Sequence, residues 1–178
     1  MRTETVARNY AEALFELGER SGNVQRYADL MDAVAAAVEQ TPRVQAVLMS
    51  PKVPKAAKAR FLGGALRDTP REFVLFLQSL VKRGRQQILR AIATEYLNLL
   101  DQKLNRVRAG VTLARTPDEK LKRAIQEALS RQLGKEVIPA FTVDPEILGG
   151  TIVRVGEQVL DGSLRRRMTK LRRQLLSH

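Results

Sequence analysis

The sequence contains no cysteine, and its only histidine is His178, the last residue. Disulfides, thiolate metal sites and cysteine nucleophiles are therefore excluded. A catalytic or metal-binding group built on several histidines is excluded as well. Aromatic residues make up only 4% of the chain, so the core must consist of Leu, Val, Ile and Ala. No apolar run approaches the roughly 20 residues that span a bilayer, and the charged opening MRTETVARNY lacks the apolar region of a secretory signal.

Glycine-rich stretches supply no phosphate-binding motif. Gly134-Lys135 does not fit the Walker pattern, because Leu129 stands where the first glycine is needed and Glu136 follows the lysine. Gly149-Gly150 precedes a predicted strand rather than a helix, so we interpret it as a turn. We expect no catalytic residue, no metal ligand and no cofactor.

Positive charge is the strongest compositional feature. The net charge is +12, from 31 basic and 19 acidic residues, and residues 164–178 hold six basic residues and no acidic one. Such a segment fits a solvated helix face, a nucleic-acid footprint or a dock for an acidic partner. After residue 105 the only aromatic residue is Phe141, so this part of the chain has almost no aromatic side chains on which bases could stack. A basic adaptor that binds nucleic acid stays the alternative function.

Apolar residues recur with a helical period through the first 105 residues. The sequence Thr69-Pro70-Arg71-Glu72 resembles a capping box, Gly63-Gly64 is expected to end or fray a helix, and Gly84 suits a helix C-terminus. Short loops between the helices are typical of an α bundle. The expected helices lie at about residues 4–19, 23–39, 42–49, 54–66, 70–82 and 85–105.

At Arg106 the apolar period changes to two, which predicts a strand. A second capping box, Thr116-Pro117-Asp118-Glu119, opens a helix that ends at Gly134. We predict further strands at residues 137–143, 151–155 and 158–160, and a basic helix after Ser163. The fold class is therefore mainly α, with an N-terminal six-helix bundle (1–105) followed by a small α+β C-terminal domain (106–178).

The first helix has an apolar arc that is wider than one packing contact requires. One interpretation buries this helix on two sides of the bundle, and the other leaves part of the arc to receive a partner helix. Its main stripe is Val6, Tyr10, Ala13, Leu14 and Leu17, and its second flank is Ala7, Ala11 and Phe15.

Three stretches carry a family resemblance. They are TVARNYAEALFELG at residues 5–18, LVKRGRQQILRAIATEYLNLLD at residues 80–101, and VDPEILGGTIVRVGEQVLDGSLRRRMTKL at residues 143–171. Together they resemble the F-type ATP synthase delta subunit family, whose mitochondrial relative is the oligomycin-sensitivity-conferring protein. The resemblance implies a non-catalytic peripheral-stalk subunit that links the catalytic head to the b-subunit stalk and resists rotor torque.

The resemblance also implies partners and sites. The helical domain is expected to bind the N-terminal helix of an alpha subunit in a groove of its first and fifth helices, with Tyr27 packed beneath. The C-terminal domain is expected to contact the b subunit dimer. We expect a peripheral protein at the cytoplasmic face of the cell membrane, bacterial or organelle-encoded, without membrane insertion or nucleic-acid binding. The residues implied for the alpha subunit are Val6, Tyr10, Ala13, Leu17, Phe76 and Ser79, and those for the b subunit are Leu164, Arg165, Met168, Leu171, Arg172 and Leu175.

Overall fold

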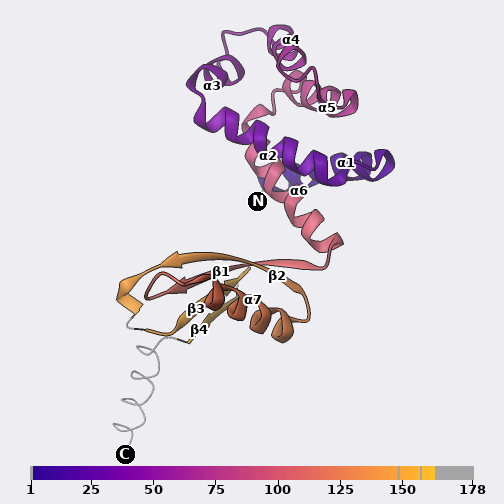
Figure 1. The fold of residues 1–178 in the computed structure, drawn as a ribbon. Coiled ribbons are helices and arrows are strands. Elements are labelled where there is room, and N and C mark those ends of the chain that lie inside the picture. The colour runs from indigo at the N-terminus through magenta and orange to yellow at the C-terminus, as the bar shows by residue number, and fades with distance from the viewer. Residues whose placement is uncertain (1, 148, 157, 163–178) are drawn as a thin grey trace, which may run out of the picture. The chain divides into compact units, whose positions relative to one another are not determined.

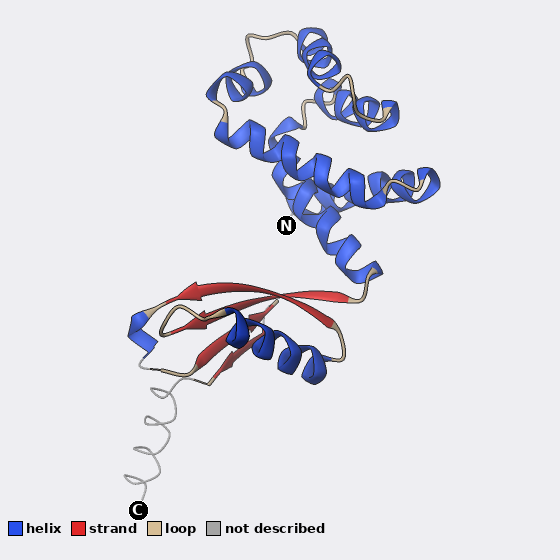
Figure 2. Cartoon of the chain, viewed as in Figure 1, coloured by secondary structure: helices blue, strands red, loops and turns tan. Residues whose placement is uncertain are grey.

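The computed structural model describes residues 2–147, 149–156 and 158–162. The chain divides into two compact units, Met1–Asp101 and Gln102–His178, which we call the helical unit and the sheet unit. The helical unit is built from helices, and the sheet unit contains a four-stranded sheet with a helix packed on it (Figure 2). A mainly helical fold with a small C-terminal sheet is therefore confirmed.

The helices of the helical unit form close to where the apolar period predicts them. The helix predicted to end or fray at Gly63 and Gly64 runs through both glycines and ends at Ala65, directly after them. The Gln78 side-chain amide donates to the Ala59 carbonyl at 3.0 Å and ties this helix to the next. The helices are α1 (Arg2–Ser21), α2 (Val24–Gln40), α3 (Pro42–Met49), α4 (Lys55–Ala65), α5 (Arg71–Lys82), the 3₁₀ turn η1 (Gln86–Ile88) and α6 (Leu89–Lys103) (Figure 1).

The two ends of α5 differ in how well the sequence predicts them. Gly84 adopts a left-handed φ of 69°, and its N–H donates to the Val81 carbonyl, as expected of a helix C-cap glycine. The prediction of a capping box at the N-terminus of α5 was wrong. Thr69 uses its hydroxyl to donate to the Leu66 carbonyl at 2.8 Å, and Pro70 occupies the N-cap position without a side-chain hydrogen bond. The preceding turn therefore holds the threonine that would have capped the helix.

One apolar core runs through the helical unit. Every α-helix from α1 to α6 contributes at least one buried side chain to it, so none of these helices is an appendage. The centre is aliphatic with a few rings, as the low aromatic content predicts. Representative buried residues, taken from α1 to α6 in order, are Leu14, Met31, Leu48, Leu62, Leu77 and Ile92.

The sheet unit begins where the helical period ends. Its strand order is β2-β1-β3-β4, with β1 and β2 parallel and the other neighbouring pairs antiparallel. The parallel pair is joined by α7, as a crossover between parallel strands requires. The elements are β1 (Arg106–Leu113), α7 (Glu119–Leu133), β2 (Glu136–Val143), the 3₁₀ turn η2 (Pro145–Ile147), β3 (Thr151–Val155) and β4 (Gln158–Asp161) (Figure 1).

Helix α7 packs on one face of the sheet and starts later than its predicted capping box. The N-cap is Asp118, whose carboxylate accepts from the Leu121 N–H at 2.7 Å, and not Thr116. Gly134 ends α7 in the left-handed conformation, as predicted. The buried residues between α7 and the sheet are Ala109, Val111, Leu113, Leu129, Val137 and Val153. The basic helix predicted after Ser163 lies outside the described residues.

Candidate partner-binding face

Helix α1 presents two different apolar faces. Its inner face carries Ala7, Ala11, Leu14 and Gly18, all of which are buried. These positions are mostly small, so neighbouring helices can approach the α1 backbone closely. A Cβ atom at Gly18 would lie 2.9 Å from the Tyr96 hydroxyl oxygen, which is too close for real Cβ contacts. The inner face of α1 is thus fixed by packing.

The expected partner-binding residues lie on the other side of α1. Val6, Tyr10 and Leu17 are half-buried, and Ala13 between them is exposed. The positions follow the spacing of one helical stripe, so they share a face. Tyr10 and Leu17 pack partly against the core, so α1 has neighbours on this side as well, but Ala13 itself does not enter the core.

Helix α5 continues this face. The rings of Tyr10 and Phe76 meet edge to face, with centroids 6.1 Å apart and planes at 73°. Ser79 is half-buried one turn further along α5, and its hydroxyl donates to the Phe76 carbonyl at 2.7 Å, which leaves no unpaired donor. The structure therefore joins the two helices at Tyr10 and Phe76. We call the surface formed by Val6, Tyr10, Ala13, Leu17, Phe76 and Ser79 the α1–α5 face.

Arg85 adjoins this face, and the sequence did not single it out. Its guanidinium carbon lies 5.4 Å from the centre of the Tyr10 ring, and Nη1 donates to the Tyr10 hydroxyl at 3.2 Å. Arg85 directly follows Gly84, so the sequence did predict that the backbone turns at this point. The contact between Arg85 and Tyr10 could not be predicted from the sequence, because 75 positions separate the two residues.

Two buried tyrosines lie in the core beside the inner face. Tyr27 packs against Phe73 of α5, with ring centroids 5.5 Å apart. Tyr96 donates its hydroxyl to the Val24 carbonyl at 2.9 Å, and burial raises the pKa of its phenol well above the ordinary value. Both hydroxyls serve the interior of the helical unit, and neither is presented to solvent as an acid or a base.

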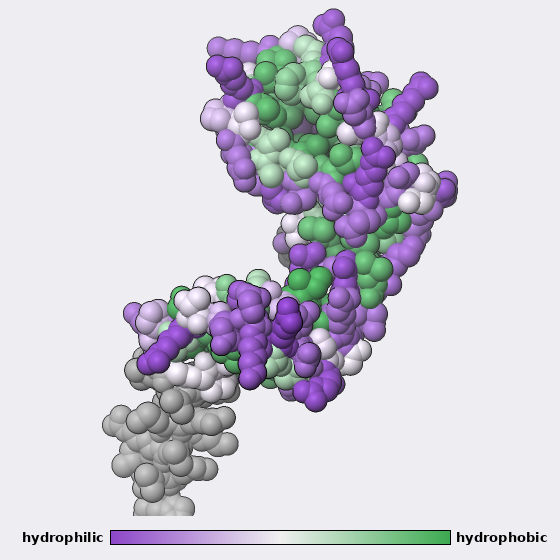
Figure 3. Space-filling model, in the orientation of Figure 1, coloured by the Kyte–Doolittle hydropathy of each residue, from purple (hydrophilic) through white to green (hydrophobic). Residues whose placement is uncertain are grey.

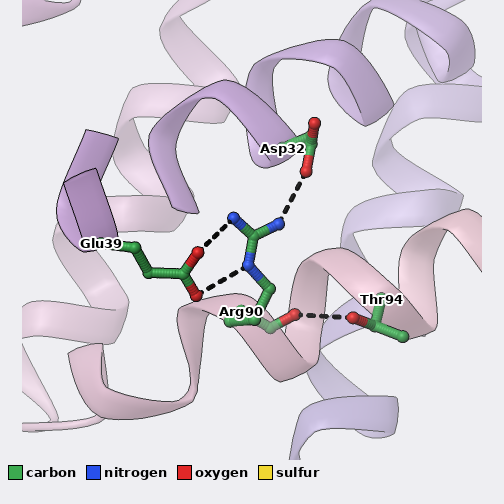
Figure 4. A network of polar contacts seen from close by, with 4 residues as sticks. All are labelled: Asp32, Glu39, Arg90 and Thr94. Carbon is green, nitrogen blue, oxygen red and sulfur yellow. Dashed lines mark hydrogen bonds and ion pairs between the residues drawn. The ribbon is translucent and has the colours of Figure 1, made fainter. Parts of the chain in front are cut away.

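A polar clamp joins α2 to α6 (Figure 4). Arg90 binds Glu39 through two nitrogens, at 2.9 and 2.7 Å, and Asp32 through a third contact at 2.7 Å. The hydrogen bond from Arg90 holds the pKa of the Glu39 carboxyl below its usual value. All three side chains are at least 40% exposed, so solvent screens the clamp and its contribution to stability is modest.

Other large apolar side chains also reach the surface. In the helical unit they include Phe61 on α4 and Leu75 on α5, and Figure 3 shows apolar residues gathered on one side of this unit between hydrophilic ones. In the sheet unit, a hollow of about 470 Å³ lies between α7 and the strands β3 and β4, with Leu129, Val153 and Leu160 in its lining. The six residues expected to contact the b subunit, from Leu164 to Leu175, lie outside the described residues.

Metal-ligating side chains do not cluster in the described part of the chain. Within residues 2–147, 149–156 and 158–162, no three His, Cys, Asp or Glu side chains are arranged to hold a metal ion. Another hollow of the sheet unit, of about 520 Å³, is lined mainly by apolar and glycine residues, and Arg115 is the titratable residue in it.

None of the helices among the described residues has the length and apolar character needed to cross a membrane.

Comparison with known proteins gives a consistent result. Residues 6–175 match the family described as OSCP, ATP synthase delta (OSCP) subunit. The ATP synthase subunit delta of Gemmatimonas aurantiaca is 44% identical over 173 residues, which cover 97% of this chain and 94% of that protein. The protein of the same name from Desulforamulus reducens is 36% identical over 173 residues, covering 97% and 96%. A chain in the cryo-EM structure of the Toxoplasma gondii mitochondrial ATP synthase hexamer shares the fold, with a TM-score of 0.71 at 20% identity and coverage of 96% and 97%.

Proposed function

The chain belongs to the ATP synthase delta (OSCP) subunit family, a non-catalytic family of the peripheral stalk, and from this premise we propose that its α1–α5 face binds the N-terminal helix of the alpha subunit. The observation that carries the proposal is the exposure of Ala13 between the half-buried Tyr10 and Leu17. A helix laid on this face would cover apolar side chains that the core leaves partly open. Helix-in-groove recognition uses anchors of this spacing.

The small side chain of Ala13 favours a helical partner. Helices pack at interaxial distances of roughly 8–10 Å, and small residues at the contact allow the shorter distances. Tyr10 and Phe76 come from different helices, and their touching rings form one aromatic pair beside Ala13 for a docked helix to contact. Buried aromatic anchors supply much of the binding energy of an interface. We expect Tyr10 and Phe76 to be the main anchors.

We also propose that residues 1–105 act as one six-helix bundle, a rigid receptor for the alpha subunit. The single core shared by α1 to α6, and the division of the chain after Asp101, support this proposal. A fragment of residues 1–105 should then fold alone and melt cooperatively. A broad, weakly helical melt of this fragment would contradict the proposed domain.

We further propose that the sheet unit contacts the b subunit dimer, so that the chain links the catalytic head to the stalk. Family membership carries this part, together with the basic, apolar-striped sequence from Leu164 to Leu175. A rotary motor transmits torque only if its catalytic head is held against the membrane sector, so the chain must bind at both ends and dissociate slowly. The complex would place the chain at the cytoplasmic face of the membrane.

The absence of cysteine makes a direct test of the α1–α5 face possible. A single cysteine at the exposed position 13 (Ala13→Cys) can be labelled with a maleimide, with and without a synthetic peptide of the alpha-subunit N-terminus. The matched control is Ala33→Cys, at an exposed position of α2. We expect the peptide to slow labelling at position 13 and to leave position 33 unaffected. Equal labelling rates at position 13 with and without saturating peptide would contradict the proposed function.

A further inference from the structure

Basic side chains gather at the C-terminal end of α5, next to the α1–α5 face. The Lys55 ammonium donates to the Lys82 carbonyl at 2.9 Å, which brings α4 to this end of α5. Lys82, Arg83 and Arg85 follow within four positions and are exposed. Among the described residues, none of these four side chains forms an ion pair. We call Lys55, Lys82, Arg83 and Arg85 the basic end of the face.

The fold of the chain fixes the position of Arg85. Gly84 turns the chain in the left-handed conformation, and the Arg85 N–H donates to the Leu80 carbonyl at 2.9 Å. The Arg85 guanidinium is then held on Tyr10 by the hydrogen bond and the ring contact described above. A guanidinium has five N–H donors, so most of them stay available for another acceptor. Arg85 is thus positioned in advance at one limit of the α1–α5 face.

The local charge is not balanced by the helix itself. The C-terminus of a helix carries a partial negative charge of about half an elementary charge, which is too small to offset four cations. The missing counter-charge has to come from solvent ions or from a partner. Because the whole chain has a net charge of +12, a second copy of this chain is a poor source.

We propose that the basic end holds carboxylates of the helix that docks on the α1–α5 face, with Arg85 as the principal contact. The proposal rests on the proposed function and adds a direction to it, because it places the acidic end of the docked helix beside Arg85. A guanidinium can bind a carboxylate through two parallel hydrogen bonds, and one that is already positioned loses little freedom on binding. Charge complementarity of this kind selects one orientation of the partner.

The experiment uses the full chain and two synthetic peptides of the alpha-subunit N-terminal segment. One peptide has the natural sequence, and in the other each Asp and Glu is replaced by Asn or Gln. The variant is Arg85→Gln, and the matched control is Arg71→Gln, which removes the same charge at the opposite end of α5. We expect Arg85→Gln to weaken the natural peptide about tenfold and the neutralised peptide less than twofold. We expect Arg71→Gln to change either affinity less than twofold.

Each other outcome has a definite meaning. An equal loss of affinity for both peptides would show that Arg85 only supports the Tyr10 ring, and it would overturn the proposal. If Arg71→Gln weakened the natural peptide as much as Arg85→Gln, the basic end would act only through general long-range attraction. That result would overturn the proposal too. A natural segment without carboxylates would contradict the proposal at once. Failure of the proposed function itself is recognised separately, because the unmodified chain would then bind neither peptide.

Discussion

The two faces of α1 show how one helix serves both a core and a partner. On the inner face, Ala7, Ala11 and Gly18 allow close approach, and Leu14 fills the space between the helices. The outer face carries the larger Tyr10 and Leu17 but leaves them half-buried. Residue size therefore does not indicate which face is internal. Small residues line the inner face because buried neighbours, including Tyr96, occupy the remaining volume.

This difference predicts separable effects of mutation. Changes on the inner face should lower stability, and changes at the exposed Ala13 of the outer face should lower affinity for the partner alone. All three tyrosines of the chain, Tyr10, Tyr27 and Tyr96, lie in the helical unit, and there is no tryptophan. Tyrosine fluorescence therefore reports the unfolding of the helical unit without a signal from the sheet unit.

The largest expected effect on stability is that of Leu14→Ala. Leu14 is fully buried, and truncating such a side chain removes apolar contacts and leaves a cavity. We expect a loss of about 3 kcal/mol in the free energy of unfolding. Urea unfolding followed by tyrosine fluorescence measures it. The control is Leu75→Ala on α5, where the leucine is 52% exposed, and the account is contradicted if the two variants lose the same stability.

A smaller loss is expected for Gly18→Ala. Alanine favours a helix over glycine by about 1 kcal/mol, but its methyl group would lie 2.9 Å from the Tyr96 hydroxyl oxygen and 3.2 Å from the Val24 Cα atom. Overpacking of this kind costs about 1–3 kcal/mol, so we expect a net loss of about 1 kcal/mol. Gly64→Ala in α4 is the control, because, apart from the adjoining backbone of its own helix, no atom lies within 4 Å of its added methyl group. A gain in stability at position 18 equal to that at position 64 would contradict close packing of the inner face.

The smallest effect is expected for Arg90→Gln, which breaks the polar clamp away from both faces of α1. The melting temperature should fall by less than for Gly18→Ala, and the exposed Arg43→Gln on α3 should change it even less. Because the clamp lowers the pKa of Glu39 in the folded chain, its stabilisation is present above the ordinary glutamate pKa of about 4.3 and is lost as the pH falls through the lowered value. The difference between the variant and the unmodified chain should therefore shrink between pH 7 and pH 3. A difference that stays constant over this range would exclude Glu39 as the group responsible.

Much of the fold could be predicted because its signals are local. The change of apolar period at Arg106 marks the first strand, and the glycines at positions 84 and 134 end helices in a conformation that other residues adopt at a cost. The two capping boxes failed for a local reason of another kind. Before α5 the preceding turn takes the Thr69 hydroxyl and leaves Pro70 at the N-cap without a side-chain acceptor, whereas Asp118 caps α7 in place of Thr116.

The candidate site was harder to predict because its contacts are not local. The inner and outer stripes of α1 are offset by a single residue, or about 100° around the helix, and both are apolar. Only the side chains that pack on α1, such as Tyr96, decide that Ala11 is buried and that Ala13 is exposed. The contact between Arg85 and Tyr10 depends on tertiary structure in the same way.

The most direct test of the central claim is a titration of the Ala13→Asp variant with the alpha-subunit N-terminal peptide. A carboxylate at this position would be buried without a partner under a docked helix, which costs a few kcal/mol. We expect the affinity to fall about a hundredfold, at roughly 1.4 kcal/mol per tenfold, with an unchanged thermal melt. Ala33→Asp, the same change at an exposed position of α2, should bind the peptide as the unmodified chain does. Normal affinity in Ala13→Asp would remove the partner from this face, and a lost melt would show that Ala13 belongs to the core.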